Sequence, residues 1–360
     1  MSRFTATQAI LAQCRAGFET EAAQELAQTC LRKRLDGRGA FETGSGYALW
    51  QFDDDIDWQD AQKDFASASL CFARQAWPVL AHIARLPERD RVTPIVEAVK
   101  ALRTAVSDIC LEYPDTNAGK TRSGFCKRFE APLRTGLEAA GLLKPGMRKA
   151  PTLYLFFPDA HAVFIGLCEP RHASRWPMGI ARLRMPREAP SRSTLKLAEA
   201  LHSLLDAEER DRALRAGGKA VDLGAAPGGW SWQLANHGLR VTAVDNGAMD
   251  KALLADGLVT HLRADGFTWR PNGTVDWLVC DMVEQPSRIA TLMADWFVHK
   301  KCRHAIFNLK LPMKKRGEAL RQCTDIIRSK LKGIPIVLRF KHLYHDREEV
   351  TAYLSRLDTR

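Results

Sequence analysis

A short stretch near the middle of the chain, Ala220 to Trp232, constrains the fold more than any other. Its sequence AVDLGAAPGGWSW passes from an apolar run into a glycine-rich loop and then into an aromatic, amphipathic segment. This order predicts a strand, a tight loop and a helix. In parallel α/β sheets, ligands bind where such a loop follows the carboxyl end of a strand and the next helix begins with free backbone N–H groups. The stretch therefore predicts a ligand-binding loop in an α/β sheet.

The spacing of the glycines restricts the ligand. Gly224 is followed by Ala225, Ala226 and Pro227, which is not the G-x-G-x-x-G pattern of a dinucleotide loop. The loop also lacks the Lys-Ser/Thr ending of a nucleoside triphosphate loop. We therefore expect a nucleoside ligand without phosphates, and the alternative is a glycine-rich turn that binds nothing.

Length and composition describe a globular protein of two or three domains. The chain has 360 residues, of which 46% are hydrophobic and 26% are charged. It contains no run of about 18 apolar residues, and its first residues do not resemble a signal peptide. Its nine cysteines are scattered without a C-x-x-C pair, which is typical of reduced thiols and predicts no metal site. We expect a cytoplasmic protein that does not contact membranes.

Positive charge is concentrated in two parts of the chain. The net charge is −2 over residues 1–100, +7 over 101–200, −3 over 201–300 and +9 over 301–360. A nucleic acid partner would explain both basic parts, because Lys and Arg contacts to phosphates supply most non-specific affinity. On charge alone, a solvated basic surface explains the pattern equally well.

The N-terminal part alternates between predicted strands and helices. Strands are predicted at 9–14, 46–52 and 74–86, helices at 19–29, 58–67 and 93–104, and a loop at the acidic run DDDIDW. This order predicts a ferredoxin-like α+β domain over residues 1–105.

A second α+β unit is predicted over residues 106–172. It contains a strand at 108–117, a glycine-containing loop at 119–124, a helix ending near 143 and a hairpin of strands at 152–157 and 162–168. We expect its basic turn and helix start to bind RNA phosphates. The alternative is a packing domain with ordinary surface lysines. The residues expected to contact RNA are Lys120, Arg122, Lys127 and Arg128.

Residues 173–192 are rich in proline and arginine and have no regular period, which predicts a linker before a C-terminal domain at 193–360. In that domain, strands after the glycine loop end in charged residues. Asp245 follows a strand at 240–244, Asp281 follows one at 275–280 and Lys310 follows one at 305–309. We expect Asp245 to accept hydrogen bonds from ribose hydroxyls, and Asp265, at another strand end, to contact a base amine.

The motif DLGAAPGGW, followed by CDM and FNLK, resembles the S-adenosylmethionine-dependent methyltransferases that methylate ribose 2′-hydroxyls in RNA. The hallmark of these enzymes is a Lys-Asp-Lys-Glu set, which corresponds here to Lys196, Asp281, Lys310 and Glu349. Glu348 is adjacent, and we choose Glu349 because it directly precedes the last predicted strand. The order of domains, with a basic THUMP-like unit before the methyltransferase domain, is similar to the ribosomal RNA large subunit methyltransferase M family of bacteria.

The resemblance implies a Rossmann-like methyltransferase domain with a mostly parallel seven-stranded sheet, preceded by ferredoxin-like and THUMP-like α+β domains. It implies S-adenosylmethionine as the cofactor and the 2′-hydroxyl of a cytidine in 23S ribosomal RNA, or its precursor, as the methyl acceptor. We expect a monomer. The residues expected to bind the cofactor are Ser193, Gly224, Ala226, Pro227, Gly228, Gly229, Trp230, Asp245, Asp265 and Asp281.

The chemistry of the four-residue set can also be argued from its side chains. A ribose hydroxyl is a poor nucleophile, so a base must remove its proton during attack on a methyl group. We expect Lys310 to be that base, with the Lys196 cation favouring its neutral form, and the two carboxylates to hold both lysines. The alternatives are a methyltransferase acting on another RNA and a non-catalytic RNA-binding assembly protein. A nicotinamide-dependent dehydrogenase would need the dinucleotide glycine spacing.

Overall fold

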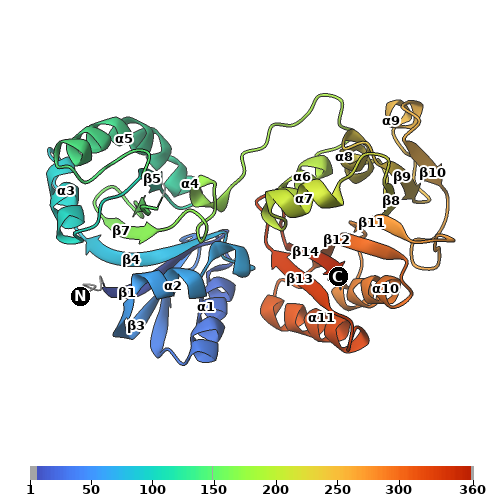
Figure 1. Cartoon of the computed structure of the whole chain (residues 1–360), viewed down its shortest axis with the longest axis horizontal. Helices are drawn as coiled ribbons and strands as arrows, with labels where there is room; N and C mark the ends of the chain where they lie inside the picture. Colours follow the sequence, from blue (N-terminus) through green and yellow to red (C-terminus); the bar gives the residue numbers. More distant parts are fainter. Residues whose placement is uncertain (1–5, 148, 358–360) are drawn as a thin grey trace. The chain divides into compact units, whose positions relative to one another are not determined.

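The computed structural model describes residues 6–147 and 149–357. The chain divides into two compact units, Met1–Ile180 and Ala181–Arg360. Each unit is built on a seven-stranded sheet with helices packed against it (Figure 1).

The first unit has one sheet of strand order β2-β3-β1-β4-β7-β6-β5. Its strand pairs are antiparallel except for β5 and β6, which run parallel. The strands that the sequence predicts in two separate α+β units therefore share one sheet, in which β4 pairs with β7. The strands are β1 (Ala6–Gln13), β2 (Gly37–Phe41), β3 (Tyr47–Asp57), β4 (Gln75–Ile83), β5 (Asp108–Glu112), β6 (Thr152–Phe156) and β7 (Val163–Cys168).

The helices of this unit pack against strands from β2 to β5. Helix α1 contacts β2 and β3, and α2 contacts β4. Helix α5 contacts β5 and α3, and its buried side chains join a core of apolar residues from β6 and β7. The helices are α1 (Glu19–Lys33), α2 (Trp58–Asp64), η1 (Ser67–Ser69), α3 (Val92–Ala101), α4 (Asn117–Lys120) and α5 (Arg122–Ala139).

Two local predictions for this unit are wrong, and one strand was not predicted. Residues 119–124 are not a loop, because the Thr116 side chain accepts the Gly119 N–H and starts α4. A Cβ at Gly119 would lie 1.9 Å from the Pro114 carbonyl oxygen, so this glycine allows a close backbone contact and does not mark a turn. The acidic run 53–57 is not a loop either, since it continues β3 and pairs with β1. The edge strand β2 was not predicted.

The second unit has a sheet of order β10-β9-β8-β11-β12-β14-β13. Only β14 runs antiparallel to its neighbours, and the other pairs are parallel. This confirms the predicted Rossmann-like, mostly parallel seven-stranded sheet. The strands are β8 (Lys219–Leu223), β9 (Arg240–Val244), β10 (Val259–Leu262), β11 (Val275–Cys280), β12 (Cys302–Lys310), β13 (Ile336–Lys341) and β14 (Glu349–Arg356).

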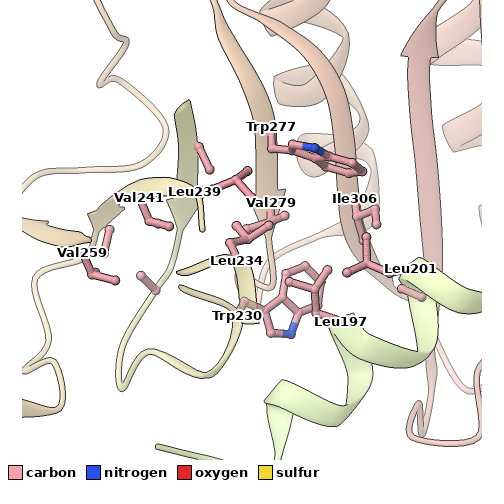
Figure 2. Packing of buried hydrophobic residues seen from close by; sticks show 14 of the residues in the cluster. Leu197, Leu201, Trp230, Leu234, Leu239, Val241, Val259, Trp277, Val279 and Ile306 are labelled. Carbon is pink, nitrogen blue, oxygen red and sulfur yellow. The ribbon is translucent and has the colours of Figure 1, made fainter. Parts of the chain in front are cut away.

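Helices cover both faces of this sheet, with α10 and α11 on the face opposite α6 and α8 (Figure 1). On the α6 and α8 face, Leu197 and Trp230 pack against Trp277 and Ile306 (Figure 2). Each large apolar side chain buried in this way contributes about 1.5–3 kcal/mol to folding. The helices are α6 (Ser193–Ser203), α7 (Ala207–Ala213), α8 (Gly229–Asn236), α9 (Lys251–Ala255), α10 (Pro286–Val298) and α11 (Arg316–Lys330).

The strand order changes direction between β8 and β11. From β8 the chain proceeds outward to β9 and β10, and from β11 it proceeds to β12 on the other side. Ligands of doubly wound sheets bind at the carboxyl ends of strands at such a point. Leu223, the last residue of β8, pairs with Cys280, the last residue of β11. The fold therefore places the Gly224 loop beside Asp281.

The segment after β7 is irregular apart from the short 3-10 helix η2 (Pro177–Gly179). The Met178 side chain is buried, and its backbone N–H donates to the fully buried Glu112 carboxylate at 2.6 Å. Trp77 and Gln75 donate to the same carboxylate. These bonds fix the start of the predicted linker to the first unit.

Candidate active site

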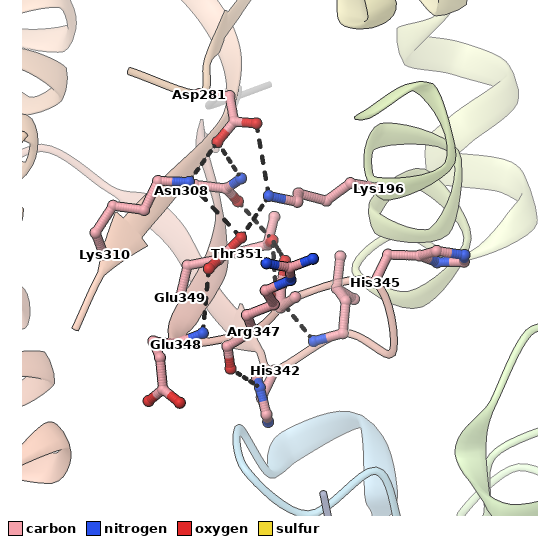
Figure 3. Close-up of polar contacts among 12 residues, drawn as sticks. Lys196, Asp281, Asn308, Lys310, His342, His345, Arg347, Glu348, Glu349 and Thr351 are labelled. Atoms are coloured by element: carbon pink, nitrogen blue, oxygen red, sulfur yellow. Dashed lines mark hydrogen bonds and ion pairs between the residues drawn. The ribbon is translucent and has the colours of Figure 1, made fainter. Parts of the chain in front are cut away.

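Two lysines and two carboxylates meet at the carboxyl edge of the second sheet (Figure 3). The Lys196 ammonium lies 2.6 Å from Glu349 Oε1 and 3.5 Å from Asp281 Oδ2. The Lys310 ammonium lies 2.8 Å from Asp281 Oδ1 and 3.7 Å from Glu349 Oε1. Each lysine therefore contacts both carboxylates. We call these four residues the lysine–carboxylate cluster.

The sheet topology explains why residues so distant in sequence meet. Lys310 ends β12 and Glu349 begins the antiparallel β14, so the two are direct cross-strand partners. Asp281 directly follows β11, which is the other neighbour of β12. Lys196 comes from α6, whose Thr194 hydroxyl donates to the Gly229 carbonyl at the start of α8 at 2.7 Å. The helix that supplies Lys196 is thus bonded to the glycine loop.

The two adjacent glutamates have different partners. Glu349 is in the cluster, whereas the Glu348 carboxylate accepts two hydrogen bonds from the Arg316 guanidinium, at 2.9 and 2.8 Å. The Glu348 side chain is also more exposed than that of Glu349. Glu348 therefore pairs outside the cluster.

Burial and charge act in opposite directions on the cluster. Burial alone would raise the pKa of Glu349, but the hydrogen bond and charge of Lys196, with Lys310, lower it to about 2. Burial would lower the pKa of Lys196, but Asp281, Asp346 and Glu349 outweigh it and raise that pKa above its usual value. Glu349 is therefore a carboxylate and Lys196 an ammonium group at neutral pH.

Lys310 differs from Lys196 in its exposure. Its side chain is 26% exposed, against 10% for Lys196. The Lys196 ammonium contacts two carboxylates, at 2.6 and 3.5 Å, so the more buried lysine is closely paired.

The glycine loop lies at the start of α8, as predicted. Ala226 donates its N–H to Asp245 Oδ2 at 3.0 Å, so the loop is bonded to the end of the neighbouring strand β9. Asp245 also accepts the N–H of Gly247 at 2.6 Å. Asp265 is exposed in the turn after β10 and accepts the N–H of Phe267.

These groups fit a nucleoside that carries no phosphate. Carboxylates at strand ends can accept hydrogen bonds from ribose hydroxyls and from amines, and they repel phosphates. The N-cap residue Gly228 has no side chain to cap α8, and in the first turn the Ser231 N–H is bonded to Asp222. Gly228 and Gly229 are packed tightly, since a Cβ at Gly229 would lie 2.2 Å from Ser193 Oγ and 2.4 Å from Ser191 Oγ. Ser193 therefore contacts the loop, and Trp230 is a core residue, 2% exposed.

Sequence reasoning missed three buried polar residues beside the cluster. Asn308 donates to Asp281, and Thr351 contacts both Asn308 and Asp346. Asn308 and Thr351 lie two residues from Lys310 and Glu349, so the period of a β-strand could have placed them on the same faces. Nothing in the sequence pattern indicates Asp346.

Asp222, in β8, is a further buried carboxyl group that was not predicted as a site residue. It accepts a hydrogen bond from the Ser231 hydroxyl of α8 at 2.7 Å. Burial raises its pKa to about 7, although the Ser231 hydrogen bond acts in the opposite direction.

The residues predicted to contact RNA lie in the first unit, on α4 and α5. Lys120, Lys127 and Arg128 are exposed, and Arg122 is half-buried. Within the described residues no helix is long and apolar enough to cross a bilayer. The same residues contain no group of His, Cys, Asp and Glu side chains arranged to hold a metal ion.

Three family models match parts of the chain. The model for the RlmM ferredoxin-like domain matches residues 7–77, and the one for the N-terminal region of ribosomal RNA large subunit methyltransferase M matches 90–169. The FtsJ-like methyltransferase model matches residues 189–305, which include the glycine loop and Asp281.

Curated relatives match along nearly the whole chain. The ribosomal RNA large subunit methyltransferase M of Thauera aminoaromatica is 52% identical over 356 residues, which cover 96% of this chain and 95% of that protein. The protein of the same name from Azoarcus sp. (strain BH72) is 53% identical, with the same coverage. The one from Methylococcus capsulatus is 46% identical and covers 98% of this chain and 99% of its own length.

The Rossmann-like sheet, the glycine loop at its switch point and the FtsJ-like match define an S-adenosylmethionine-dependent methyltransferase. The relatives then specify the family. The chain belongs to the ribosomal RNA large subunit methyltransferase M family and is accordingly an rRNA methyltransferase, as the sequence resemblance predicts.

Proposed function

We propose that this protein methylates the 2′-hydroxyl of a cytidine ribose in 23S ribosomal RNA, or its precursor, with Lys310 as the general base. The observation that carries the proposal is the lysine–carboxylate cluster, in which Lys310 and Lys196 share two carboxylates. The names of the relatives support the large ribosomal RNA as substrate. The choice of cytidine follows from the resemblance to the family.

The cluster supplies what methylation of a ribose hydroxyl requires. When bound, S-adenosylmethionine supplies a methyl carbon that a positively charged sulfur activates towards nucleophiles. The Lys310 amine accepts the proton of the 2′-hydroxyl as the hydroxyl oxygen forms its bond to that carbon. The electron pair of the broken carbon–sulfur bond remains on sulfur, so charge is balanced by the new Lys310 ammonium.

The other three members of the cluster prepare Lys310 for this role. Lys196 remains an ammonium because three carboxyl groups surround it, and it shares the Asp281 and Glu349 carboxylates with Lys310. Asp281 and Glu349 hold both lysines at fixed distances and stabilise the ammonium that forms on Lys310. Positioned acid–base groups of this kind contribute about 10²- to 10⁴-fold to a rate.

We also propose that Asp245 binds the cofactor ribose and Asp265 its base amine, with the Gly224–Gly229 loop against the rest of the nucleoside. The support is their place at the ends of β9 and β10 and the bond from Ala226 to Asp245. The basic residues of α4 and α5 are proposed to bind RNA phosphates, because their side chains are mostly exposed.

The proposal is tested by incubating the full chain with S-adenosylmethionine labelled in its methyl group and deproteinised large-subunit RNA. A 2′-O-methyl group blocks alkaline cleavage of the adjacent linkage, because the 2′-oxygen can no longer attack the phosphate. We expect the label in an alkali-resistant dinucleotide. Label released entirely in mononucleotides would mean that a base is methylated.

A further inference from the structure

A buried polar pair lies directly behind the lysine–carboxylate cluster. Asn308 of β12 and Thr351 of β14 are cross-strand partners, two residues further into the sheet than Lys310 and Glu349 and on the same face. Both residues are fully buried. The next pair on the same face is Ile306 and Tyr353, which belongs to the apolar core. A polar pair between charged and apolar layers is costly unless its hydrogen bonds are satisfied.

The hydrogen bonds of this pair lead to Asp281. Asn308 Nδ2 donates to Asp281 Oδ1 at 2.7 Å, the same oxygen that contacts Lys310 at 2.8 Å. Thr351 Oγ1 donates to Asn308 Oδ1 at 2.7 Å. The Asp281 carboxylate only accepts, so the Asn308 nitrogen must face it and the Asn308 oxygen must face Thr351. With the amide turned this way, Asn308 links the Thr351 hydroxyl to the Asp281 carboxylate (Figure 3).

Asp346 holds Thr351 from the other side. Its carboxyl oxygens lie 3.1 and 3.3 Å from Thr351 Oγ1, and it accepts the Leu343 N–H at 3.0 Å. Thr351 has one hydroxyl proton, and its shortest contact is with Asn308. Burial raises the pKa of Asp346 well above its usual value, against the effect of Lys196. Thr351 is therefore held between Asn308 and the Asp346 carboxyl group.

We propose that Asn308 and Thr351 are positioning residues, which hold the Asp281 carboxylate with one oxygen on Lys310 and the other towards Lys196. This inference rests on the proposed function, in which the two lysines act at the ribose hydroxyl. Without the Asn308 donor, the Asp281 side chain can rotate about its own bonds and lose the arrangement in which both lysines share it. Asp281 lies in a loop after β11, and through this pair it is bonded to the paired strands β12 and β14, which are more rigid than a loop.

Two substitutions of Thr351 distinguish the effect of its hydroxyl, which positions Asn308, from the effect of its methyl group, which packs in the core. Thr351→Val keeps nearly the same volume and removes the hydroxyl, whereas Thr351→Ser keeps the hydroxyl and removes a methyl group. We expect Thr351→Val to lower kcat about 10- to 100-fold. Without the Thr351 hydroxyl, Asn308 is held less firmly, and its hydrogen bond to the charged Asp281 is weakened. Thr351→Ser should stay within about 3-fold of wild type, and KM for RNA should change little in either variant.

The control is Thr7→Val, which removes a buried hydroxyl bonded to the Val79 carbonyl in the first unit. It should leave kcat unchanged. Asn308→Ala serves as an independent variant, and combining it with Thr351→Val should slow the enzyme no further than Asn308→Ala alone. Thermal unfolding identifies variants that do not fold.

The inference is contradicted if Thr351→Val, as a folded protein, turns over at the wild-type rate, or if Thr351→Ser is as slow as Thr351→Val. It is also contradicted if Asn308→Ala is as fast as wild type. These rate ratios are independent of where the methyl group is attached. Alkaline hydrolysis of the wild-type product tests the ribose assignment separately, so failure of that assignment and failure of the positioning role are distinguishable.

Discussion

The two lysines of the cluster are chemically alike but have different surroundings. Lys196 is the more buried and contacts Glu349 at 2.6 Å, and neighbouring carboxyl groups raise its pKa. Lys310 is the more exposed and ends a strand at the edge where ligands of such sheets bind. These positions support the proposal that Lys196 is a fixed cation and Lys310 the proton acceptor.

We predict that Lys310→Ala lowers the rate of methyl transfer by at least about 10²-fold, because the hydroxyl loses its base. Binding of S-adenosylmethionine, measured by calorimetry, should change little. Lys330→Ala on α11 is the control, since that lysine pairs with Asp295 on the surface and should be dispensable. A folded Lys310→Ala protein that no longer binds the cofactor would instead make Lys310 a cofactor residue.

At the scale of single elements, Asp222 connects the central strand β8 to α8 through Ser231. Burial raises its pKa in the folded protein to about 7, from an unfolded value of about 3.9. The folded state then binds a proton between these two values that the unfolded state releases. The contribution of Asp222 to stability is therefore greatest at low pH and declines as the pH rises from about 4 to about 7.

Asp222→Asn cannot ionise, so we predict that it loses less stability than wild type between pH 5 and pH 8. The difference should be on the order of 1–3 kcal/mol. Urea unfolding of both proteins at the two pH values measures it, and titration of other groups cancels in the comparison. Equal pH dependence in wild type and Asp222→Asn would show that Asp222 is ionised throughout.

The elements that the sequence predicts well are those with strong patterns. The glycine loop between β8 and α8 and the strands β9 and β11 appear where predicted, because each apolar run is bounded by turn residues or an acidic residue. The two wrong loop predictions arise because glycine and aspartate are typical of loops but also occur in helices and strands. Gly119 allows a close contact at α4, and the exposed carboxylates of residues 53–57 are tolerated in β3.

In the candidate site too, some features can be predicted from the sequence and others cannot. The sequence, with its family resemblance, identifies the four residues of the cluster, and the structure brings them together. The contacts among them depend on the antiparallel register of β12 and β14, which pairs Lys310 with Glu349 and Asn308 with Thr351. This register joins segments about 40 residues apart, and no local pattern in the chain specifies it.

For the whole molecule, the charge distribution is the property most relevant to RNA. The basic residues of α4 and α5 belong to the first unit, and the lysine–carboxylate cluster belongs to the second. We therefore propose that the first unit contributes sequence-independent affinity through phosphate contacts, whereas the second performs the chemistry.

We predict that reversing the charge of Lys120, Lys127 and Arg128 together weakens RNA binding and lowers the slope of log affinity against log salt by about 2. The matched control reverses Lys33, Lys63 and Lys100, surface lysines of the same unit that are paired with carboxylates. The control should retain the wild-type slope. Equal slopes in wild type and the test variant would place the RNA-binding surface elsewhere.

Methylation of a cytidine ribose is tested by identifying the modified nucleoside. The full chain is given an isotopically labelled methyl donor and either deproteinised large-subunit RNA or precursor particles. The methylated RNA is then digested completely, and its nucleosides are analysed by mass spectrometry. We predict that the label is found in 2′-O-methylcytidine. Label on a base, or on the ribose of another nucleoside, would contradict it.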